Sequence, residues 1–257
     1  MTHHKEEMAA EGILIKNLEE PEFLGEMRGI VDDFFKLPTS KYVSMDRESF
    51  QELALDCQRH LNKIGVQERF YKSERNFFDR VFESEKLLFE SVIFFRAVRP
   101  LQDGVLQENP DFHRESMYSD HEHTRHVLNV WCPLKNVEEK NTLKYVPKSH
   151  LIPDSELLVE VNESTPSKVK KHSAGHGLGF LWKPKQITSG VNLNSAVNMN
   201  FKENDYAIFS SMLVHGGGDN NSDKIRFAFG FGVIPENKMG FNKSFFASGG
   251  KPHYMAF

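Results

Sequence analysis

Residues 111–120, DFHRESMYSD, place an imidazole and a carboxylate two positions apart, at His113 and Glu115. In an extended segment, side chains at positions i and i+2 point to the same face. We therefore expect the two groups to converge, although neither would contribute to an apolar core. Such an arrangement is costly unless a ligand binds both groups, so this pair is the first candidate for a metal site.

A third ligand would close such a site, and the best candidate is His215. It ends the apolar run DYAIFSSMLVH and is followed by three glycines, which let the backbone turn and approach closely without side-chain clashes. Two histidines and one carboxylate on one face of a metal form the facial triad of non-haem Fe(II) oxygenases. These residue types predict an iron site with coordination positions left open for O2 and a cosubstrate.

Arg226 opens the next predicted strand, RFAFGFGVIP, and the side chains along this strand alternate in kind. The face of the arginine continues with small residues, Ala228, Gly230 and Gly232. The opposite face carries large apolar residues, Phe227, Phe229, Phe231 and Val233. Because arginine binds carboxylates through two parallel hydrogen bonds, this pattern predicts a groove that contains a carboxylate clamp.

Four segments in this order resemble the phytanoyl-CoA dioxygenase-like family of Fe(II)/2-oxoglutarate-dependent oxygenases. They are FHRE, HVLNVWCPLKNV, NTLKYVPKSH and HGGGDNNSDKIR, and the resemblance runs from about residue 91 to 235. It implies a double-stranded β-helix, or jelly roll, of the cupin-like type. It also implies that His113, Glu115 and His215 hold Fe(II) and that Arg226 holds the distal carboxylate of 2-oxoglutarate.

The same resemblance implies a further cosubstrate contact from Asn129, and the chain departs from the family pattern at two positions. The family usually has Asp where this chain has Glu115, but the retained carboxylate argues against a halogenase, in which this position is vacated for halide. A hydroxyl residue that helps to hold 2-oxoglutarate is common where this chain has Gly217. Either Ser210 or Ser211 compensates, or the cosubstrate is anchored by the arginine alone.

The implied reaction oxidises a substrate C–H bond while 2-oxoglutarate and O2 yield succinate and CO2. We expect a small polar metabolite as substrate, such as a sugar, nucleotide-sugar or amino-acid derivative, with Arg96, Tyr118 and Trp131 as candidate contacts. The alternative is a non-redox cupin-like metal protein with the same fold, either an isomerase or epimerase or a sugar-binding module. That protein would bind metal without responding to 2-oxoglutarate.

Three further patterns have more than one interpretation. In SDHEHTRH, the side chains of His121, His123 and His126 form either a second metal site or a solvated loop near the mouth of the first. The basic stretch 168–176, KVKKHSAGH, is a candidate lid. The string HGGG also builds oxyanion holes in esterases, but the chain lacks the G-x-S-x-G elbow that carries the nucleophile in that class of hydrolase.

The elements that must position these residues change in kind near residue 90. Apolar residues at helical spacing predict helices over 20–37, 46–65 and 73–91, the second capped by Asp46 and stopped by Gly65. Short apolar or alternating runs between turn residues predict a mainly β core over 91–235, with the helical segment 1–90 packed outside. Since no linker separates the two segments, we predict one domain over 1–257 that ends in an extension, 236–257.

Composition limits the partners that we expect. The 257 residues carry a formal net charge of -4, which gives no basic field to attract nucleic acid or anionic membranes. The two cysteines, Cys57 and Cys132, lie too far apart for a disulfide framework. No signal peptide or membrane-spanning run is evident, so we expect a cytoplasmic protein. Aromatic residues near the C-terminus would pack on the core or on a second copy in a homodimer.

Overall fold

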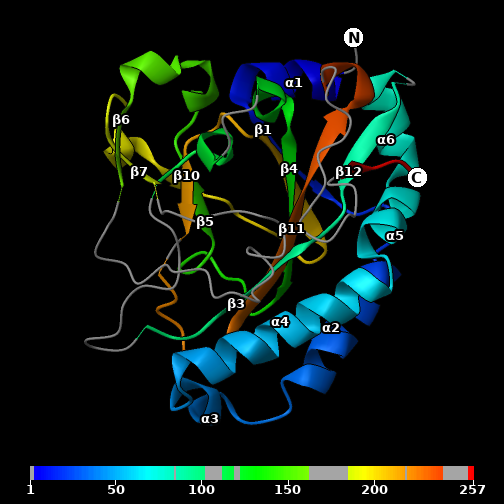
Figure 1. Cartoon of the computed structure of the whole chain (residues 1–257), viewed down its shortest axis with the longest axis vertical. Coiled ribbons are helices and arrows are strands. Elements are labelled where there is room, and N and C mark those ends of the chain that lie inside the picture. Colours follow the sequence, from blue (N-terminus) through cyan, green and yellow to red (C-terminus); the bar gives the residue numbers. More distant parts are fainter. Residues whose placement is uncertain are drawn as a thin grey trace.

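A large antiparallel sheet lies at the centre of the computed structural model, in the order β1-β9-β4-β11-β2-β12, with β3 also paired to β11 (Figure 1). The strands of this sheet are β1 Ile13–Asn17, β2 Leu87–Glu90, β3 Phe94–Val98, β4 Leu128–Lys135, β9 Asp205–Ser210, β11 Arg226–Pro235 and β12 Tyr254–Met255. The structure describes residues 3–83, 85–101, 112–118, 122–161, 185–217, 219–239 and 254–257.

Two smaller sheets and two kinds of helix complete the fold. One small sheet has the order β10-β5-β8, with β10 His215–Gly217, β5 Leu143–Tyr145 and β8 Val197–Asn198, and the other pairs β6 Leu158–Val161 with β7 Lys185–Ser189. The α-helices are α1 His3–Glu11, α2 Glu22–Phe34, α3 Thr39–Val43, α4 Arg47–Lys63, α5 Val66–Ser73 and α6 Arg75–Phe82. Short 3-10 helices are η1 Glu115–Tyr118, η2 Glu122–His126, η3 Ser149–Leu151, η4 Asp154–Glu156, η5 Leu193–Ser195 and η6 Glu236–Lys238.

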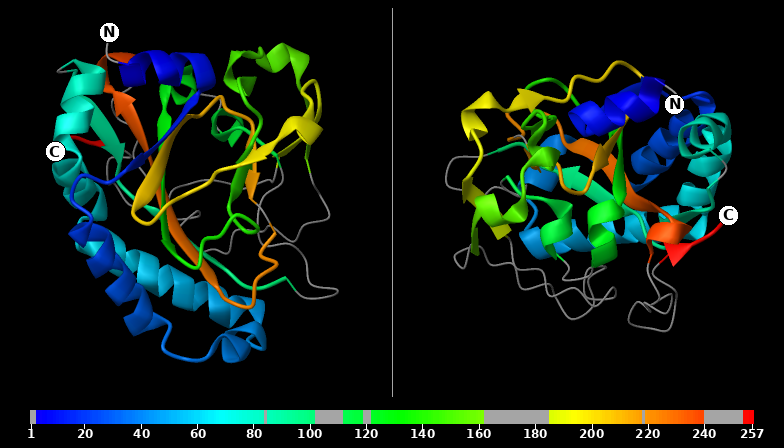
Figure 2. Two further views of the ribbon diagram at one scale, coloured as in Figure 1. Left: turned by 180° about the vertical axis from the view of Figure 1, so that it is seen from behind. Right: turned by 90° about the horizontal axis from the view of Figure 1, so that it is seen from above.

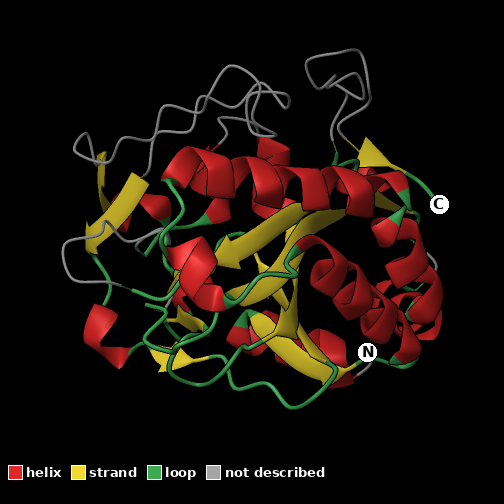
Figure 3. Cartoon of the chain, turned by 90° about the horizontal axis from the view of Figure 1, so that it is seen from below, coloured by secondary structure: helices red, strands yellow, loops and turns green. Residues whose placement is uncertain are grey.

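Helices α2, α4, α5 and α6 gather on one side of the large sheet, and the small sheets lie on the other (Figures 1 and 2). The aromatic face of β11 packs into the helical layer, with ring centroids 4.7 Å apart for Phe227 and Phe35 and 5.4 Å apart for Phe231 and Phe70. Figure 3 shows the same helices in red beside the yellow strands. The predicted mainly β core with helices packed outside is therefore confirmed.

The predicted limits of the second helix follow from its caps. The side chain of Asp46 accepts a hydrogen bond from the backbone N–H of Ser49 at 2.9 Å, which satisfies a donor that the first turn leaves unpaired. Helix α4 ends at Lys63, and Gly65 then adopts a left-handed φ of 70°. A side chain at Gly65 would be strained in this conformation.

The predicted third helix, over 73–91, is wrong in its second half. Helix α6 ends at Phe82, where Glu83 turns into the left-handed region with φ of 51°. Residues 87–90 form β2 instead, because Leu87 and Phe89 are buried in the helix-facing core while the alternate residues point the other way. This alternation is the period of a strand, and pairing with β11 satisfies its backbone groups.

Two more strands lie outside the segment 91–235 that was predicted to form the core. Strand β1 pairs with β9, and β12 pairs with β2, so both belong to the large sheet. The division of the chain as one domain over 1–257 stays a prediction. Among the described residues, no helix is long and apolar enough to cross a membrane. Both cysteines, Cys57 and Cys132, are buried and unpaired, as predicted.

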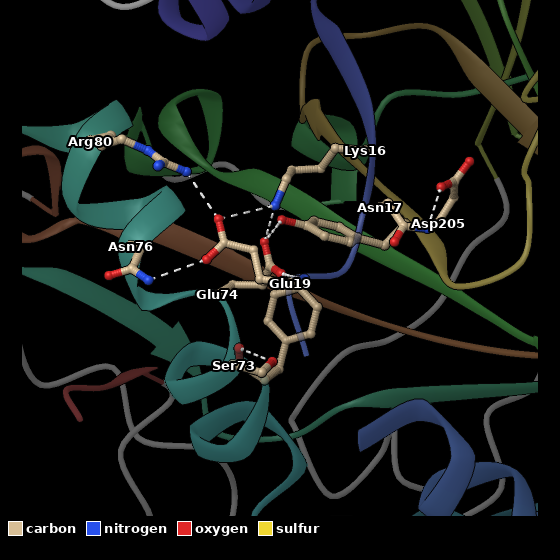
Figure 4. A network of polar contacts seen from close by, with 10 residues as sticks. Lys16, Asn17, Glu19, Ser73, Glu74, Asn76, Arg80 and Asp205 are labelled. Carbon is tan, nitrogen blue, oxygen red and sulfur yellow. Dashed lines mark hydrogen bonds and ion pairs between the residues drawn. The ribbon is translucent and has the colours of Figure 1, made fainter. Parts of the chain in front are cut away.

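A buried carboxylate joins the helical layer to the edge of the sheet (Figure 4). Glu74 lies between α5 and α6 and is fully buried. Its oxygens accept hydrogen bonds from Lys16 Nζ of β1, from the backbone N–H of Glu19 at 2.5 Å and from Tyr206 Oη of β9 at 2.5 Å. Arg80 of α6 pairs with Glu19 at 2.9 Å and extends the network to the surface. The network therefore fixes where α5 and α6 meet β1 and β9.

Replacing this carboxylate should destabilise the fold strongly. In Glu74→Ala the Lys16 ammonium, which is only 15% exposed, would lose its buried partner, and we expect the free energy of unfolding to fall by about 3–5 kcal/mol. Urea denaturation followed by circular dichroism measures the change. Glu20→Ala removes an exposed carboxylate and should change it by less than about 0.5 kcal/mol. Equal losses in the two variants would contradict the anchoring role of Glu74.

Candidate active site

Backbone pairing brings His113 and His215 together although they lie far apart in the sequence. The backbone N–H of His113 donates to the carbonyl of His215 at 2.8 Å, and the backbone N–H of His215 donates to the carbonyl of His113 at 3.0 Å. The ring centroids of the two imidazoles are 4.5 Å apart. His215 begins β10 and pairs there with Tyr145 of β5. The small sheet therefore positions both imidazoles.

Glu115 joins the two histidines by a route other than the one predicted. The extended conformation ends with the bridge at His113, and Glu115 begins the 3-10 helix η1. Its Oε1 still lies 3.4 Å from His113 Nε2 and 3.5 Å from His215 Nε2. The predicted convergence is present, but a tight helical turn produces it, not the alternation of a strand.

The three side chains form a compact donor set. One ligand atom from each lies within 4.8 Å of the others, and this is the only group of its kind among the described residues. The imidazoles are 4% exposed, whereas the carboxylate is 42% exposed. The site thus has two buried donors and one open side, as a catalytic metal site requires.

The charge states of these groups suit a divalent cation. His215 Nδ1 contacts the carbonyl of Leu213 at 3.0 Å, so we assign the proton to Nδ1 and the lone pair to Nε2. Burial lowers the pKa of His215, and His113 adds to this shift, which favours the neutral ligand form. Burial opposes ionisation of Glu115, but the adjoining imidazoles outweigh it and hold the pKa of this carboxyl well below its usual range. Two imidazole nitrogens and one carboxylate fit Fe(II).

Arg114, between two of these residues, fastens the segment to the rest of the site. Its guanidinium is fully buried and donates to Asp154, to the carbonyl of Ser149 at 2.6 Å and to that of Ile152 at 2.8 Å. The hydroxyl of Ser149 accepts from the backbone N–H of Val214 at 2.8 Å, next to His215. The 149–154 turn therefore braces both segments of the site. Arg114 was not among the predicted site residues, although a cation inside the FHRE motif was a signal.

Arg226 is buried at the start of β11, with 2% of its surface exposed. Its guanidinium donates to the carbonyl of Asn141. Burial lowers the pKa of Arg226 to about 10, with a contribution from Arg96, so the guanidinium keeps its charge at neutral pH. Arg96 lies on β3 opposite Ala228, and its guanidinium carbon is 6.0 Å from the ring of Phe94. Both predicted arginines thus lie on neighbouring strands near this end of the sheet.

The other predicted contacts lie along the same strands. Asn129 of β4 pairs with Gly232 on one side and Phe209 on the other, and its buried Nδ2 has no hydrogen-bond partner among the described residues. Trp131, two positions further along β4, is buried against Phe201 at 5.1 Å between ring centroids. It is therefore part of an apolar wall.

The position expected to carry a hydroxyl is Gly217, which pairs with Leu143 in the small sheet. The two alternative serines already have partners. Ser211 Oγ donates to the carbonyl of Thr124 at 2.5 Å, and Ser210 Oγ accepts from the backbone N–H of Met212 at 3.1 Å. Their hydrogen bonds favour an anchor that rests on the arginine alone.

Some predicted residues lie outside the portion of the chain that the structure describes. These are His121, the side chain of Tyr118 and the candidate lid 168–176. His123 and His126 both lie on η2, where the ring centroid of His123 is 6.1 Å from that of Tyr254. Within the described ranges neither belongs to a second group of metal ligands.

Comparison with solved structures supports the fold. EvdO2 from Micromonospora carbonacea var. aurantiaca, complexed with 2-oxoglutarate, is 15% identical with a TM-score of 0.58, and the match covers 91% of each chain. EctD from S. alaskensis, solved with 2-oxoglutarate and 5-hydroxyectoine, is 11% identical with a TM-score of 0.57, over 98% of this chain and 85% of that one. ThoJ, a non-heme monooxygenase in its apo form, is 14% identical with a TM-score of 0.53, and the match covers 90% of this chain and 76% of that one. These likenesses confirm the predicted jelly-roll core.

Comparison with protein families gives the identity. No curated protein sequence matches the chain significantly. The model of the family "Phytanoyl-CoA dioxygenase (PhyH)" matches residues 22–228, which is most of the chain and includes the three converging side chains and Arg226. The predicted requirement for Fe(II), 2-oxoglutarate and O2 is confirmed by this match together with the donor set. The chain belongs to the phytanoyl-CoA dioxygenase family and is an Fe(II)/2-oxoglutarate-dependent oxygenase.

Proposed function

We propose that this oxygenase hydroxylates, or otherwise oxidises, a small polar metabolite at iron held by His113, Glu115 and His215. The observation that carries the assignment is the convergence of two imidazole nitrogens and one carboxylate oxygen within 4.8 Å. These three side chains would hold Fe(II), which would supply O2 activation: one oxygen atom of O2 would enter the substrate at a C–H bond, and the other would enter succinate as 2-oxoglutarate loses CO2.

Arg226 is the proposed clamp for the distal carboxylate of 2-oxoglutarate. A buried guanidinium gains from a carboxylate partner because the surroundings screen their attraction poorly. The interior face of β11 next to it carries only small residues, so a short dicarboxylate has room beside the strand. The unpaired Nδ2 of Asn129 is a donor for the end of the cosubstrate that lies nearer the metal.

The chain also keeps water away from the metal ligands. The ring of Phe209 packs on His215 with centroids 4.8 Å apart, and the bond from Nδ1 to Leu213 holds the imidazole in one orientation. Of the three proposed ligands, all within the described residues, Glu115 alone offers an open side, so the substrate would approach past this carboxylate. Polar groups at Asn129 and Arg96 on the interior face of the sheet favour a polar metabolite.

The visible spectrum of the anaerobic enzyme tests these assignments. Adding 2-oxoglutarate to the Fe(II)-loaded protein should produce a weak metal-to-ligand charge-transfer band. We expect His113→Ala to lose the iron and therefore the band. Arg226→Ala should weaken 2-oxoglutarate binding by at least about 30-fold, because the buried carboxylate of the cosubstrate would lose the guanidinium that pairs with it. His60→Ala changes an exposed residue of the helical layer and Arg69→Ala a partly exposed one, and both variants should leave the spectrum unchanged. Iron binding without a band would favour the non-redox alternative.

Arg114 should act on metal affinity by holding its neighbours in place. Arg114→Met removes the hydrogen bonds that brace the 113–115 segment, and we expect the affinity for Mn(II), as a redox-inert probe, to fall about 10- to 100-fold. Isothermal titration calorimetry measures this change, with thermal unfolding as a check on folding. Arg125 pairs with the same Asp154 but is 51% exposed, so Arg125→Ala is the matched control and should change affinity little. An unchanged affinity in folded Arg114→Met would refute the positioning role.

A further inference from the structure

We infer that Glu90 is a substrate-binding residue, and that its carboxyl accepts hydrogen bonds from an amino or hydroxyl group of the metabolite. The inference rests on the proposed function, since it concerns what binds beside the same metal site. None of the roles assigned above uses this carboxyl.

The direction of the side chain follows from the alternation along β2. Leu87 and Phe89 are buried in the core that faces the helices. Leu88 and Glu90 therefore point to the opposite face, the interior of the barrel. That face of the neighbouring β11 carries Arg226 and the small residues.

Strand register places this carboxyl in a row of residues that runs across the sheet to the metal site. Its Oε2 accepts a hydrogen bond from the backbone N–H of Gly232 at 2.5 Å. Gly232 pairs with Asn129, Asn129 pairs with Phe209, and the ring of Phe209 lies against His215. One row of residues across the sheet therefore leads from Glu90 to a proposed iron ligand.

Glycine at position 232 leaves room for the carboxyl of Glu90. A Cβ at Gly232 would lie 2.9 Å from Glu90 Cδ and 2.9 Å from Val127 Cγ1, closer than such atoms approach in proteins. Glycine at this position is therefore required for Glu90 to lie across β11. The small-residue face of this strand thus serves the carboxyl as well as the cosubstrate.

Arg226, the proposed cosubstrate clamp, lies too far from Glu90 to pair with its carboxyl. Arg226 and Gly232 are separated along β11 by six residues, or about 20 Å of extended strand. Glu90 therefore lies toward the other end of the interior face from the clamp. A ligand that meets the metal from that end is the substrate.

The environment of Glu90 favours a hydrogen-bond donor. Burial raises the pKa of this carboxyl to about 7, and the nearby charge of Glu115 acts in the same direction. The hydrogen bond from Gly232 acts in the opposite direction. The residue nevertheless keeps some of its surface accessible. A carboxylate accepts several hydrogen bonds through its two oxygens, so Glu90 can accept a donor from a ligand in addition to the hydrogen bond from Gly232. The interior thus carries a recognition group for amines and hydroxyls opposite the group that binds 2-oxoglutarate.

Binding of two ligand sets to the anaerobic Fe(II) and 2-oxoglutarate complex tests this inference. One set is amino sugars and basic amino acids, and the other is neutral sugars and polyols of matching size. Perturbation of the charge-transfer band reports binding beside the metal, and we expect at least one compound to bind the wild-type enzyme. Glu90→Ala should weaken that binding about 10- to 100-fold while changing the affinities for Mn(II) and 2-oxoglutarate by less than about 2-fold.

Two further variants separate the possible ligands and the possible roles. Glu90→Gln keeps an acceptor but no charge, so it should retain a hydroxyl ligand and lose an amine. Gly232→Ala should reproduce the loss in Glu90→Ala by displacing the carboxyl, and Glu85→Ala, an exposed carboxylate before β2, should bind as the wild type does. Equal binding in the wild type and Glu90→Ala, or no binding from either set, would overturn the inference. If the wild-type protein with Fe(II) and 2-oxoglutarate shows no charge-transfer band, the proposed function would be overturned instead.

Discussion

The two faces of β11 carry side chains that cannot exchange places. Phe227, Phe229 and Phe231 are buried against the helices, while Arg226 and the small residues face the interior of the barrel. A slip of one residue in register would turn every side chain to the other face, and burial of the rings would be lost. Hydrophobic packing on the outside of the strand therefore sets the position of Arg226, the proposed carboxylate clamp, on its inside.

The metal ligands depend on a second constraint, in a different sheet. The backbone bonds between His113 and His215 tie two distant segments together, and Arg114 fixes one of them to the 149–154 turn. The same turn holds the residue before His215 through Ser149. Because three separate segments converge on a few hydrogen bonds, contacts within the protein bring the donor atoms close together. Preorganisation of this kind reduces the conformational freedom that metal binding would otherwise remove.

The sequence predicted what depends on residue type and order, and it failed where tertiary contacts decide. The donors His113 and Glu115 were found from their spacing, but the 3-10 turn that joins them was not, because a strand and a tight turn can share that spacing. Residues 87–90 were assigned to a helix because their pairing with β11 is invisible in the local pattern. The roles proposed for Arg114 and Glu90 were not predicted for a similar reason: a charge acquires a role in the interior only through the segments that fold over it.

We propose that the three converging side chains hold a single Fe(II) next to the 2-oxoglutarate bound by Arg226. Crystals grown without oxygen in the presence of Fe(II) and 2-oxoglutarate would test it through anomalous diffraction at the iron absorption edge. We expect one iron peak bonded to His113, Glu115 and His215, with 2-oxoglutarate extending from the metal to the guanidinium. An iron peak on other side chains, or 2-oxoglutarate bound away from Arg226, would contradict it.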